Sequence, residues 1–414
     1  MTNLELTRTF TKSQDLLERA EASDAWAANR VKNYSQIEGG YPFYASHAKG
    51  AYLWDVDGNR YIDYMLGYGT VVLGHADNRV TKAVVSEIEK GACVSPLWKT
   101  AQIELNERLI SVIPKAEMSF LMKTGSDATS GALRLARAFT GRDKVVRWGY
   151  NGWHDWASPR PFGVPQSIQS DTLKSVYNDI ASLRAVFEAY PEEIACVLMM
   201  PFEIEKPQPG FLHEVRALAH EYGALFILDE MRSGFRLSLG GAQEFFDIQA
   251  DLATYSKAMS NGYPVSAVVG RKDVLSGIGR TKMTSTFFGS SYEMAAALAT
   301  ITVLQETDAI EHIWAMGRLF EKGVSELINE YEVPAVFLGY PPYPYIEFTL
   351  ADEDRNCRIR NAFYIETARC GALFHPNHHW YVSAAHTESD INETLDICRR
   401  GFEVISQKLT GGSS

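Results

Sequence analysis

The sequence predicts an α/β protein with a large domain, built on a mostly parallel central sheet, followed by a smaller α+β domain. From about residue 75 to 310, short apolar runs typical of strands alternate with helical patterns. This alternation favours a parallel sheet covered by helices on both faces. It stops after about residue 310, and a chain of 414 residues with 46% hydrophobic composition is long enough for more than one core. We therefore predict an N-terminal segment over 1–70, a large domain over 71–310 and a small C-terminal domain over 311–414.

Local patterns place the individual elements. Apolar positions at helical spacing predict an amphipathic helix over 13–30, and aromatic and β-branched runs around Asp57-Gly58 predict a hairpin over 50–65. The clearest strands of the large domain begin at residues 195, 225 and 264, with a helix over 213–223 between the first two. In the small domain we expect helices over 311–331, 356–370 and 388–408, and short strands around 344–350.

Charge and cysteine content narrow the class of protein. A net charge of −11 disfavours nucleic acid as a partner. The five cysteines never form a CxxC pair, which favours free thiols in a reducing cytoplasm and argues against structural zinc. The first thirty residues carry charges throughout, and no window has the apolar length needed to span a bilayer. We expect a cytoplasmic protein without a membrane segment.

Two acids, Asp229 and Glu230, end an apolar strand-like run in LFILDEMRSGFR (225–236). In an open α/β sheet, ligands bind at the carboxyl ends of the parallel strands. One interpretation is that both acids cap the next segment or pair with Arg232 and Arg236. The other is that one acid keeps a proton on a cationic ring nitrogen and so makes the ring an electron acceptor.

Small residues precede a predicted helix in MKTGSDATSGALRLARAFTGR (122–142). Thr124, Gly125 and Ser126 lie where this helix begins, and the backbone N–H groups and dipole of a helix N-terminus bind phosphate. The alternative is an ordinary helix cap supplied by Ser126 or Asp127.

Aromatic residues gather in RWGYNGWHDW (147–156), where glycines interrupt the chain. They form either a flat surface for stacking a ring or a hydrophobic plug beneath a loop. Four of the ten histidines fall in HPNHHWYVSAAHTESD (375–390), but no carboxylate or cysteine lies at ligand spacing from them. We therefore predict no metal site.

A single lysine, Lys257, lies between a strand-like run and a glycine-proline turn in DLATYSKAMSNGYPVSAVVG (251–270). It is either a solvated surface cation or an amine nucleophile that forms an imine with a carbonyl compound. An amine nucleophile, an acid for a ring nitrogen, a helix start for a phosphate and an aromatic plate for a ring together match pyridoxal phosphate. We therefore predict this cofactor, with Lys257 as its imine-forming residue.

The same stretches make the sequence similar to the class III aminotransferases, which are pyridoxal phosphate (PLP) enzymes of fold type I, and especially to the branch that contains glutamate-1-semialdehyde aminomutase. The resemblance runs from about residue 40 to 400, with further motifs in GAYLWDVDGNRYIDY, GHADNRVTKAV, TFFGSSYEMAAA and VSAAHTESDINETL. It implies a homodimer with the active site at its interface. It also implies these residues: the Schiff-base lysine Lys257, the ring-nitrogen partner Asp229, the phosphate-binding Thr124, Gly125 and Ser126, the stacking Tyr150, the pocket-lining Glu104, and Thr286, which reaches the phosphate of the neighbouring subunit.

Two departures from the family pattern bear on the substrate. The chain has Tyr150-Asn151-Gly152 where the family has Tyr-His-Gly, and NYSQIEGGYPFYASH (33–47) lacks the arginine with which the aminomutase branch binds its substrate's carboxylate. We therefore expect a pocket without that carboxylate clamp. Its expected liners are aromatic and imidazole side chains, which favour a polyhydroxylated or amine-bearing substrate: Tyr68, Trp98, Trp153, His378, His379 and Trp380.

The activity that this resemblance implies is that of an aminotransferase. We expect L-glutamate to give its amino group to an aldehyde or ketone acceptor, such as an oxidised amino sugar or aminoglycoside intermediate. An aminomutase or epimerase of the glutamate-1-semialdehyde aminomutase type is the alternative, because the same core residues serve both reactions. A cofactor-free Schiff-base lyase would leave the phosphate-binding and stacking residues unexplained. A non-enzymatic binding protein would not need both Lys257 and Asp229.

Overall fold

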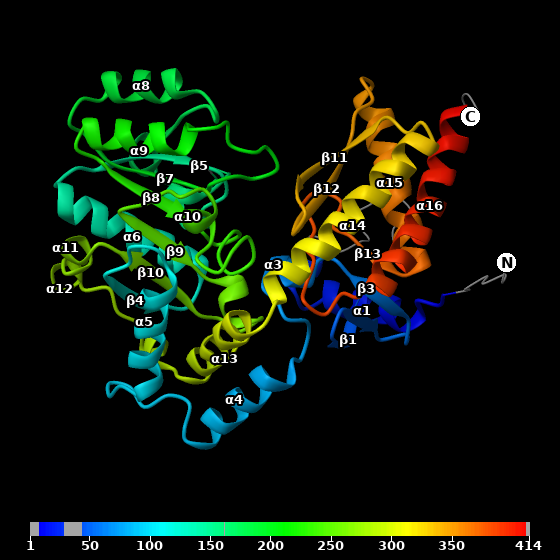
Figure 1. Cartoon of the computed structure of the whole chain (residues 1–414), viewed down its shortest axis with the longest axis horizontal. Coiled ribbons are helices and arrows are strands. Elements are labelled where there is room, and N and C mark those ends of the chain that lie inside the picture. The colour runs from blue at the N-terminus through cyan, green and yellow to red at the C-terminus, as the bar shows by residue number, and fades with distance from the viewer. Residues whose placement is uncertain (1–7, 29–43, 161, 411–414) are drawn as a thin grey trace. The chain divides into compact units, whose positions relative to one another are not determined.

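The computed structural model describes residues 8–28, 44–160 and 162–410. Its contacts divide the chain into two compact units, each described here by itself. The small unit comprises Met1–Tyr68, Leu73–Asp77 and Glu311–Ser414, and the large unit comprises Gly69–Val72 and Asn78–Ile310. In Figure 1 the large unit carries the cyan to yellow-green part of the chain, and the small unit carries the blue and the yellow-to-red parts.

A seven-stranded sheet forms the centre of the large unit. In spatial order its strands are β4 (Met118–Met122), β10 (Ser266–Gly270), β9 (Leu252–Tyr255), β8 (Leu225–Asp229), β7 (Ile194–Met199), β5 (Lys144–Trp148) and β6 (Thr172–Lys174). The strands from β9 to β6 are parallel, whereas β10 is antiparallel to both of its neighbours. The prediction of a mostly parallel α/β sheet is confirmed, and the predicted strand at 264 is the one that runs antiparallel.

Helices pack on both faces of this sheet. The described helices of the large unit are α4 (Asn78–Glu89), α5 (Thr100–Val112), α6 (Gly125–Thr140), α7 (Gln166–Ser170), α8 (Ile180–Ala189), α9 (Phe211–Glu221), α10 (Ala242–Phe245), α11 (Lys272–Leu275), α12 (Ile278–Thr281) and α13 (Tyr292–Glu306). Strand β7 shows the pattern, because successive side chains point to opposite faces. Cys196 and Leu198 join the hydrophobic core that contains side chains of α6, whereas Val197 and Met199 lie with side chains of α8 and α9.

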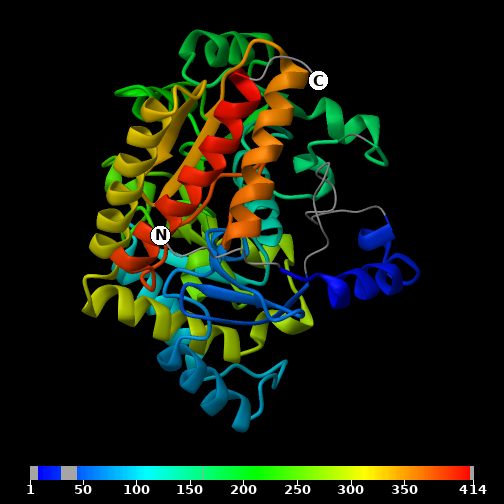
Figure 2. The same ribbon diagram turned by 90° about the vertical axis from the view of Figure 1, so that its right-hand side faces the viewer.

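The small unit joins the two ends of the described chain. Strands β1 (Ala45–Lys49), β2 (Tyr52–Asp55) and β3 (Arg60–Asp63) form an antiparallel sheet, and β13 (Ala372–Leu373) adds to β3 in parallel. A second sheet pairs β11 (Ala335–Tyr340) with β12 (Tyr343–Phe348). Three long helices complete the unit: α14 (Ala309–Glu330), α15 (Glu353–Cys370) and α16 (Glu388–Thr410). Figure 2 shows α15 and α16 side by side.

The predicted hairpin over 50–65 is confirmed by β2 and β3, but the predicted helix over 13–30 is interrupted. Helix α1 (Thr11–Glu21) ends before Asp24, and α2 (Ala25–Ala28) is a separate short turn. Asp24 accepts a hydrogen bond from the backbone N–H of Trp26 at 2.9 Å. A side chain that bonds to the backbone two residues ahead competes with a continuous helix.

None of the helices in the described parts of the chain is long and apolar enough to cross a membrane.

Candidate active site

Asp229 is the last residue of β8 and is fully buried. One carboxylate oxygen accepts a hydrogen bond from Asn151 Nδ2 at 2.9 Å, and the other accepts from the backbone N–H of Met231 at 3.1 Å. Burial raises the pKa of Asp229, while Asn151, the N–H of Met231, Lys257 and Arg232 oppose that rise. The carboxylate therefore lies out of water at the ligand-binding edge of the sheet, held by two neutral donors.

The adjacent Glu230 has a different environment. Its carboxylate accepts hydrogen bonds from the Ser233 hydroxyl and from the backbone N–H groups of Ala242 and Gln243, at 2.8 and 2.9 Å to the two nitrogens. Burial raises the pKa of Glu230 to about 7. Since Ala242 begins α10, the capping interpretation holds for Glu230. Asp229 makes no such cap, so the two neighbouring acids serve different purposes.

Lys257 lies just after β9, the strand next to β8, and only Ser256 separates it from the end of that strand. It starts a single 3₁₀ turn, Lys257–Ser260, and its φ of 48° is in the left-handed region that is unusual for lysine. Ser256 holds the surrounding loop closed through a 2.7 Å hydrogen bond from its hydroxyl to the carbonyl of Val265. The lysine is partly buried, so the interpretation as a solvated surface cation is wrong.

The electrostatic environment of Lys257 favours a neutral amine. Burial, as the largest cause, together with Arg232 and Arg236 lowers the pKa of Lys257 to about 8, and Asp229 opposes them. The lysine and the aspartate therefore act on each other's pKa. Arg236 is itself fully buried and donates to the carbonyl oxygens of Gly69 and Val71 at 3.2 and 2.7 Å. It supports the backbone of this edge of the large unit.

The start of α6 lies at the same edge. Thr124 is the N-cap: its hydroxyl accepts from the N–H of Asp127 at 3.2 Å, and the Asp127 carboxylate accepts from the N–H of Thr124 at 2.8 Å. The expectation that Ser126 or Asp127 is the N-cap residue is therefore wrong, because the cap lies earlier. No described group accepts from the N–H of Gly125 or Ser126, so two donors at the positive end of the helix dipole remain for an anion.

Gly125 leaves no room for a side chain. A Cβ on this residue would lie 2.9 Å from Sδ of Met231, two residues after Asp229. Ser266 of β10 donates its hydroxyl hydrogen to the carbonyl oxygen of Thr124 at 2.7 Å. The helix start is thus packed directly against the segment that carries the buried aspartate.

The aromatic loop is fastened to α6 by three hydroxyl groups. Thr129 donates to the carbonyl oxygen of Asn151 at 2.7 Å, Ser126 accepts from the N–H of Trp153 at 3.3 Å, and Ser130 is hydrogen-bonded to Nδ1 of His154 at 2.8 Å. This attachment gives neighbouring residues opposite surroundings. Asn151 is buried against Asp229, whereas the Tyr150 side chain is 53% exposed.

Several predicted residues of the large unit are exposed and not buried with Asp229. Glu104 is exposed on α5, and Trp98 and Trp153 are 74% and 70% exposed. Thr286 is exposed at the start of the 3₁₀ turn Thr286–Gly289, and its carbonyl oxygen accepts from the Ser95 hydroxyl at 2.8 Å. Within one described chain these four residues do not join Asp229 and Lys257.

Tyr68 and the predicted histidines belong to the small unit. The Tyr68 hydroxyl is hydrogen-bonded to Nε2 of His375 at 3.2 Å, and its ring meets that of His378 edge-on at 5.2 Å. His379 is buried and hydrogen-bonded to the Tyr381 hydroxyl at 3.1 Å. Trp380 is fully buried against Phe374, so its prediction as a pocket wall is wrong. Among the described residues, no three histidine, cysteine or acidic side chains are grouped as metal ligands.

Asn151 is the residue of this site that sequence reasoning did not place. It supplies the side-chain hydrogen bond of Asp229, while its own Oδ1 is buried without a hydrogen-bond partner in the described chain. One observation pointed to it: a polar residue between Tyr150 and Gly152 replaces the family's histidine. Only the fold shows that the asparagine is buried beneath the aromatic loop.

These features fit the predicted cofactor. Pyridoxal phosphate requires an amine for covalent attachment, an anionic partner for its ring nitrogen and donors for its phosphate. The large unit provides Lys257, Asp229 and the free N–H groups of Gly125 and Ser126 within one edge of the sheet.

Comparisons with known proteins agree. Residues 34–337 match the family model described as "Aminotransferase class-III". A 3-aminobutyryl-CoA aminotransferase from Cloacimonas acidaminovorans is 37% identical over 96% of this chain and 98% of its own length. A glutamate-1-semialdehyde 2,1-aminomutase from Methanothrix thermoacetophila is 36% identical over 86% of this chain and 89% of its own length.

Solved structures show the same fold. The FumI protein of Sphingopyxis sp. MTA144, in its PLP internal aldimine form, superposes with a TM-score of 0.91 at 30% identity, covering 96% of this chain and 97% of its own. A β-phenylalanine aminotransferase from Variovorax paradoxus superposes with a TM-score of 0.86, covering 97% of this chain and 95% of its own. At 24% identity, the second match supports the fold alone. The chain is an enzyme of fold type I whose cofactor is pyridoxal phosphate, and it belongs to the class III aminotransferases.

Proposed function

We propose that this enzyme transfers the amino group of L-glutamate to the ketone of a 3-oxoacyl compound. The observation that supports this class of acceptor is the 37% identity to a 3-aminobutyryl-CoA aminotransferase over 98% of that relative's length. It favours a 3-oxoacyl thioester over the oxidised amino sugar expected from aromatic and imidazole walls. Burial of His379 and Trp380 in the small unit also removes two of those walls.

Lys257 acts as the proton carrier in this proposal. When bound, pyridoxal phosphate supplies an electron-accepting ring that stabilises negative charge at the substrate carbon bearing the amine. An amine with a pKa of about 8 is neutral in a large fraction of molecules near that pH. It can therefore take the proton from this carbon and return it elsewhere. The nearby Arg232 and Arg236 help to keep the amine neutral between turnovers.

Asp229 and the helix start hold the cofactor in this proposal. The buried carboxylate of Asp229 would keep the ring nitrogen protonated, and its burial makes the attraction strong because little water screens it. The N–H groups of Gly125 and Ser126, at the Thr124 cap, would bind the phosphate. Tyr150 would cover one face of the ring.

We further propose a cytoplasmic homodimer. Leu97, Trp98 and Phe287 are all more than 60% exposed, and the loops that carry them are joined by the hydrogen bond from Ser95 to the Thr286 carbonyl. Exposed apolar side chains gathered on two joined loops are typical of an interface. In a dimer, Thr286 of one chain would reach the phosphate site of the other, and Glu104, Trp98 and Trp153 would line the substrate pocket.

The test uses L-glutamate labelled with ¹⁵N on the PLP-loaded enzyme. Transamination predicts one equivalent of 2-oxoglutarate per subunit before any acceptor is added. It then predicts ¹⁵N in the amine formed from 3-oxobutyryl-CoA and not in one formed from an oxidised amino sugar. If glutamate yields no 2-oxoglutarate, the donor is wrong. If label enters only the sugar product, the acceptor class is wrong.

An aminomutase is the second candidate, because a 36% identical relative carries that name. Such an enzyme, like an epimerase, keeps the amine on its own substrate. Incubation with glutamate-1-semialdehyde would then move the amine to the neighbouring carbon without incorporating ¹⁵N from added glutamate. Label in the product would exclude this candidate.

A further inference from the structure

A cavity of about 330 Å³ lies in the large unit beside the aromatic loop. The side chains that line it include Arg147, Trp148, Tyr150, Lys174, Ser175 and Glu203. Its volume is at the lower end of the range for small-molecule sites. Because Tyr150 forms one wall, the cavity borders the residue proposed to cover the cofactor ring.

Arg147 is an unusual residue for its position. It lies in β5, between two buried valines and Trp148, and only 8% of it is exposed. Its guanidinium donates one hydrogen bond, to the carbonyl oxygen of Ala157 at 2.7 Å. No carboxylate of the described chain forms an ion pair with it, and burial lowers its pKa. A buried guanidinium carries five N–H donors, so most of its capacity to bind an anion is unused.

Lys174 stands beside Arg147. The two residues are register partners in the parallel pair β5 and β6, so their side chains leave the same face of the sheet. Lys174 is exposed and forms no ion pair with a described residue. Two adjacent cations that form no ion pair repel each other, and an anion between them would remove that cost.

The remaining walls indicate what else the ligand carries. Trp148, whose ring stacks on Tyr177 at 3.8 Å, also lines the cavity. Ser175 offers a hydroxyl group, and Glu203 adds one carboxylate, which would accept a hydrogen bond from an N–H or O–H group. The cavity therefore suits an anionic group attached to a polar chain, and not a bare hydrocarbon.

We propose that this cavity is an anion subsite, in which Arg147 and Lys174 bind a phosphate or carboxylate at the end of the acceptor remote from its ketone. The subsite deepens the proposed function and depends on it for the identity of the ligand, because a thioester of coenzyme A carries such phosphates. The anion itself could belong to a phosphate ester or to a carboxylate, since Arg and Lys bind both.

The first measurement is calorimetric titration of the PLP-loaded enzyme with coenzyme A, which has no ketone and cannot turn over, and separately with inorganic phosphate and acetate. Binding of phosphate but not acetate would assign a phosphate ester, and binding of acetate would assign a carboxylate. Wild-type enzyme that binds none of the three would overturn the subsite.

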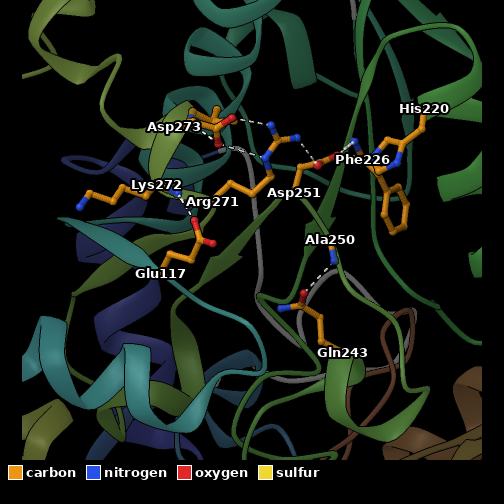
Figure 3. A network of polar contacts seen from close by, with 10 residues as sticks. Glu117, His220, Phe226, Gln243, Ala250, Asp251, Arg271, Lys272 and Asp273 are labelled. Atoms are coloured by element: carbon orange, nitrogen blue, oxygen red, sulfur yellow. Dashed lines mark hydrogen bonds and ion pairs between the residues drawn. The ribbon is translucent and has the colours of Figure 1, made fainter.

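Two variants and a control locate the binding. Lys174→Gln is exposed and leaves the fold intact, and we expect it to raise the Kd for the bound probe about tenfold, as loss of one charge-assisted contact does. Arg147→Gln should raise it more, and its melting temperature shows whether it folds. The control is Lys272→Gln. Lys272 begins α11, which packs near β4, whereas Lys174 lies on β6 at the other side of the sheet, so the Kd should be unchanged (Lys272 is labelled in Figure 3). Unchanged affinity in Lys174→Gln and in a folded Arg147→Gln would overturn the subsite.

Failure of the subsite and failure of the proposed function give different results. An enzyme that transfers ¹⁵N to 3-oxobutyryl-CoA, but whose variants bind coenzyme A like wild type, keeps the function and loses the subsite. An enzyme that transfers no label, yet binds a probe in a manner sensitive to Lys174→Gln, loses the acceptor assignment and keeps the subsite. A raised KM for 3-oxobutyryl-CoA in Lys174→Gln, with kcat little changed, would support both.

Discussion

Two buried aspartates lie at opposite ends of neighbouring strands, Asp229 at the end of β8 and Asp251 just before β9. Asp251 accepts hydrogen bonds from Arg271 Nη1 and His220 Nε2, both at 2.7 Å, and from the N–H of Phe226 at 2.8 Å (Figure 3). Among the described residues, Asp229 accepts hydrogen bonds only from the side-chain amide of Asn151 and from the backbone N–H of Met231. The same side chain, equally buried, is ion-paired at one edge of the sheet and bound only by neutral donors at the other.

The difference extends to the surroundings of each aspartate. Arg271 also binds Asp273 at 2.6 Å, and Glu117 accepts from the N–H of Lys272 at 2.8 Å, so charges at this edge have partners on the protein itself (Figure 3). At the other edge burial favours the neutral forms, because it raises the pKa of Asp229 and lowers the pKa of Lys257. Charges that are paired with other groups of the protein hold a local structure in place. A buried acid and amine with perturbed pKa values are instead typical of a reaction site.

Replacing Lys257 by alanine should have the largest effect. We expect transamination to fall about 10⁴-fold or more, because the variant loses both the attachment point and the proton carrier. PLP should still bind without a covalent bond, which borohydride reduction and mass spectrometry would reveal as the absence of a fixed adduct. Lys272→Ala, a lysine at the opposite edge, is the control and should retain activity. Wild-type turnover in Lys257→Ala would contradict the assignment.

Asp229→Asn should reduce kcat about a thousandfold, since it removes the preorganised charge at the ring nitrogen. Although the substitution lowers kcat, we do not expect it to lower the stability of the fold. Because the folded-state pKa of Asp229 is raised, this group stabilises the fold when protonated, and that contribution is lost as pH rises through the folded pKa. The cofactor-free variant should therefore melt no lower than wild type at neutral pH. A clear fall in its melting temperature would show that Asp229 is structural.

Asp251→Asn should show the converse pattern. It leaves Arg271 and His220 without the carboxylate between them, and we expect a loss of about 3 kcal/mol in the free energy of unfolding. Activity per folded molecule should be unchanged, because this edge holds no reacting group. Urea titration measures the loss, and Asp273→Asn, an exposed partner of the same arginine, should cost less than about 1 kcal/mol. Equal losses would mean that burial of Asp251 is not decisive.

Asn151→Leu tests the neutral donor of Asp229. The variant keeps the branched shape of the side chain but removes a hydrogen bond to a charged group, so kcat should fall about tenfold. The pKa of Asp229 should rise further, since Asn151 opposes its rise in the wild type. Asn151→His restores an N–H donor and should recover part of the loss. Full activity in Asn151→Leu would show that the backbone N–H of Met231 is sufficient.

The strands and the two principal residues could be predicted because their patterns are local. The apolar run ending at Asp229 identifies a buried strand and its edge, and the turn residues after Lys257 identify a loop. Even so, Asp229 and Glu230 could not be told apart, because their partners lie elsewhere in the chain. Asn151 is 78 residues before Asp229, and Gln243 is 13 residues after Glu230.

The wrong predictions concern a helix cap, which depends on a single position, and a segment without regular secondary structure. The cap of α6 is Thr124 instead of Ser126 or Asp127, because capping depends on which residue is still extended when the helix starts. The histidine segment has no strand or helix period, so the sequence could not show that Trp380 faces the core. Arg147 attracted no prediction because a lone arginine in an apolar strand has meaning only when its neighbours in space are known.

The smallest expected effect is a shift in the titration of Lys257 itself. In cofactor-free enzyme, reductive methylation requires a neutral amine, so the rate at Lys257 should rise as pH increases through about 8, well below the ordinary lysine value of 10.5. Arg232→Gln should move this midpoint upward, because Arg232 lowers the pKa. Asp229→Asn should move it downward, because Asp229 raises the pKa. Asp251→Asn should leave it in place. Mass spectrometry of the peptide containing Lys257 follows the rate. If neither the Arg232 nor the Asp229 variant moves the midpoint, burial alone sets the pKa of the amine, and the charges at this edge act independently.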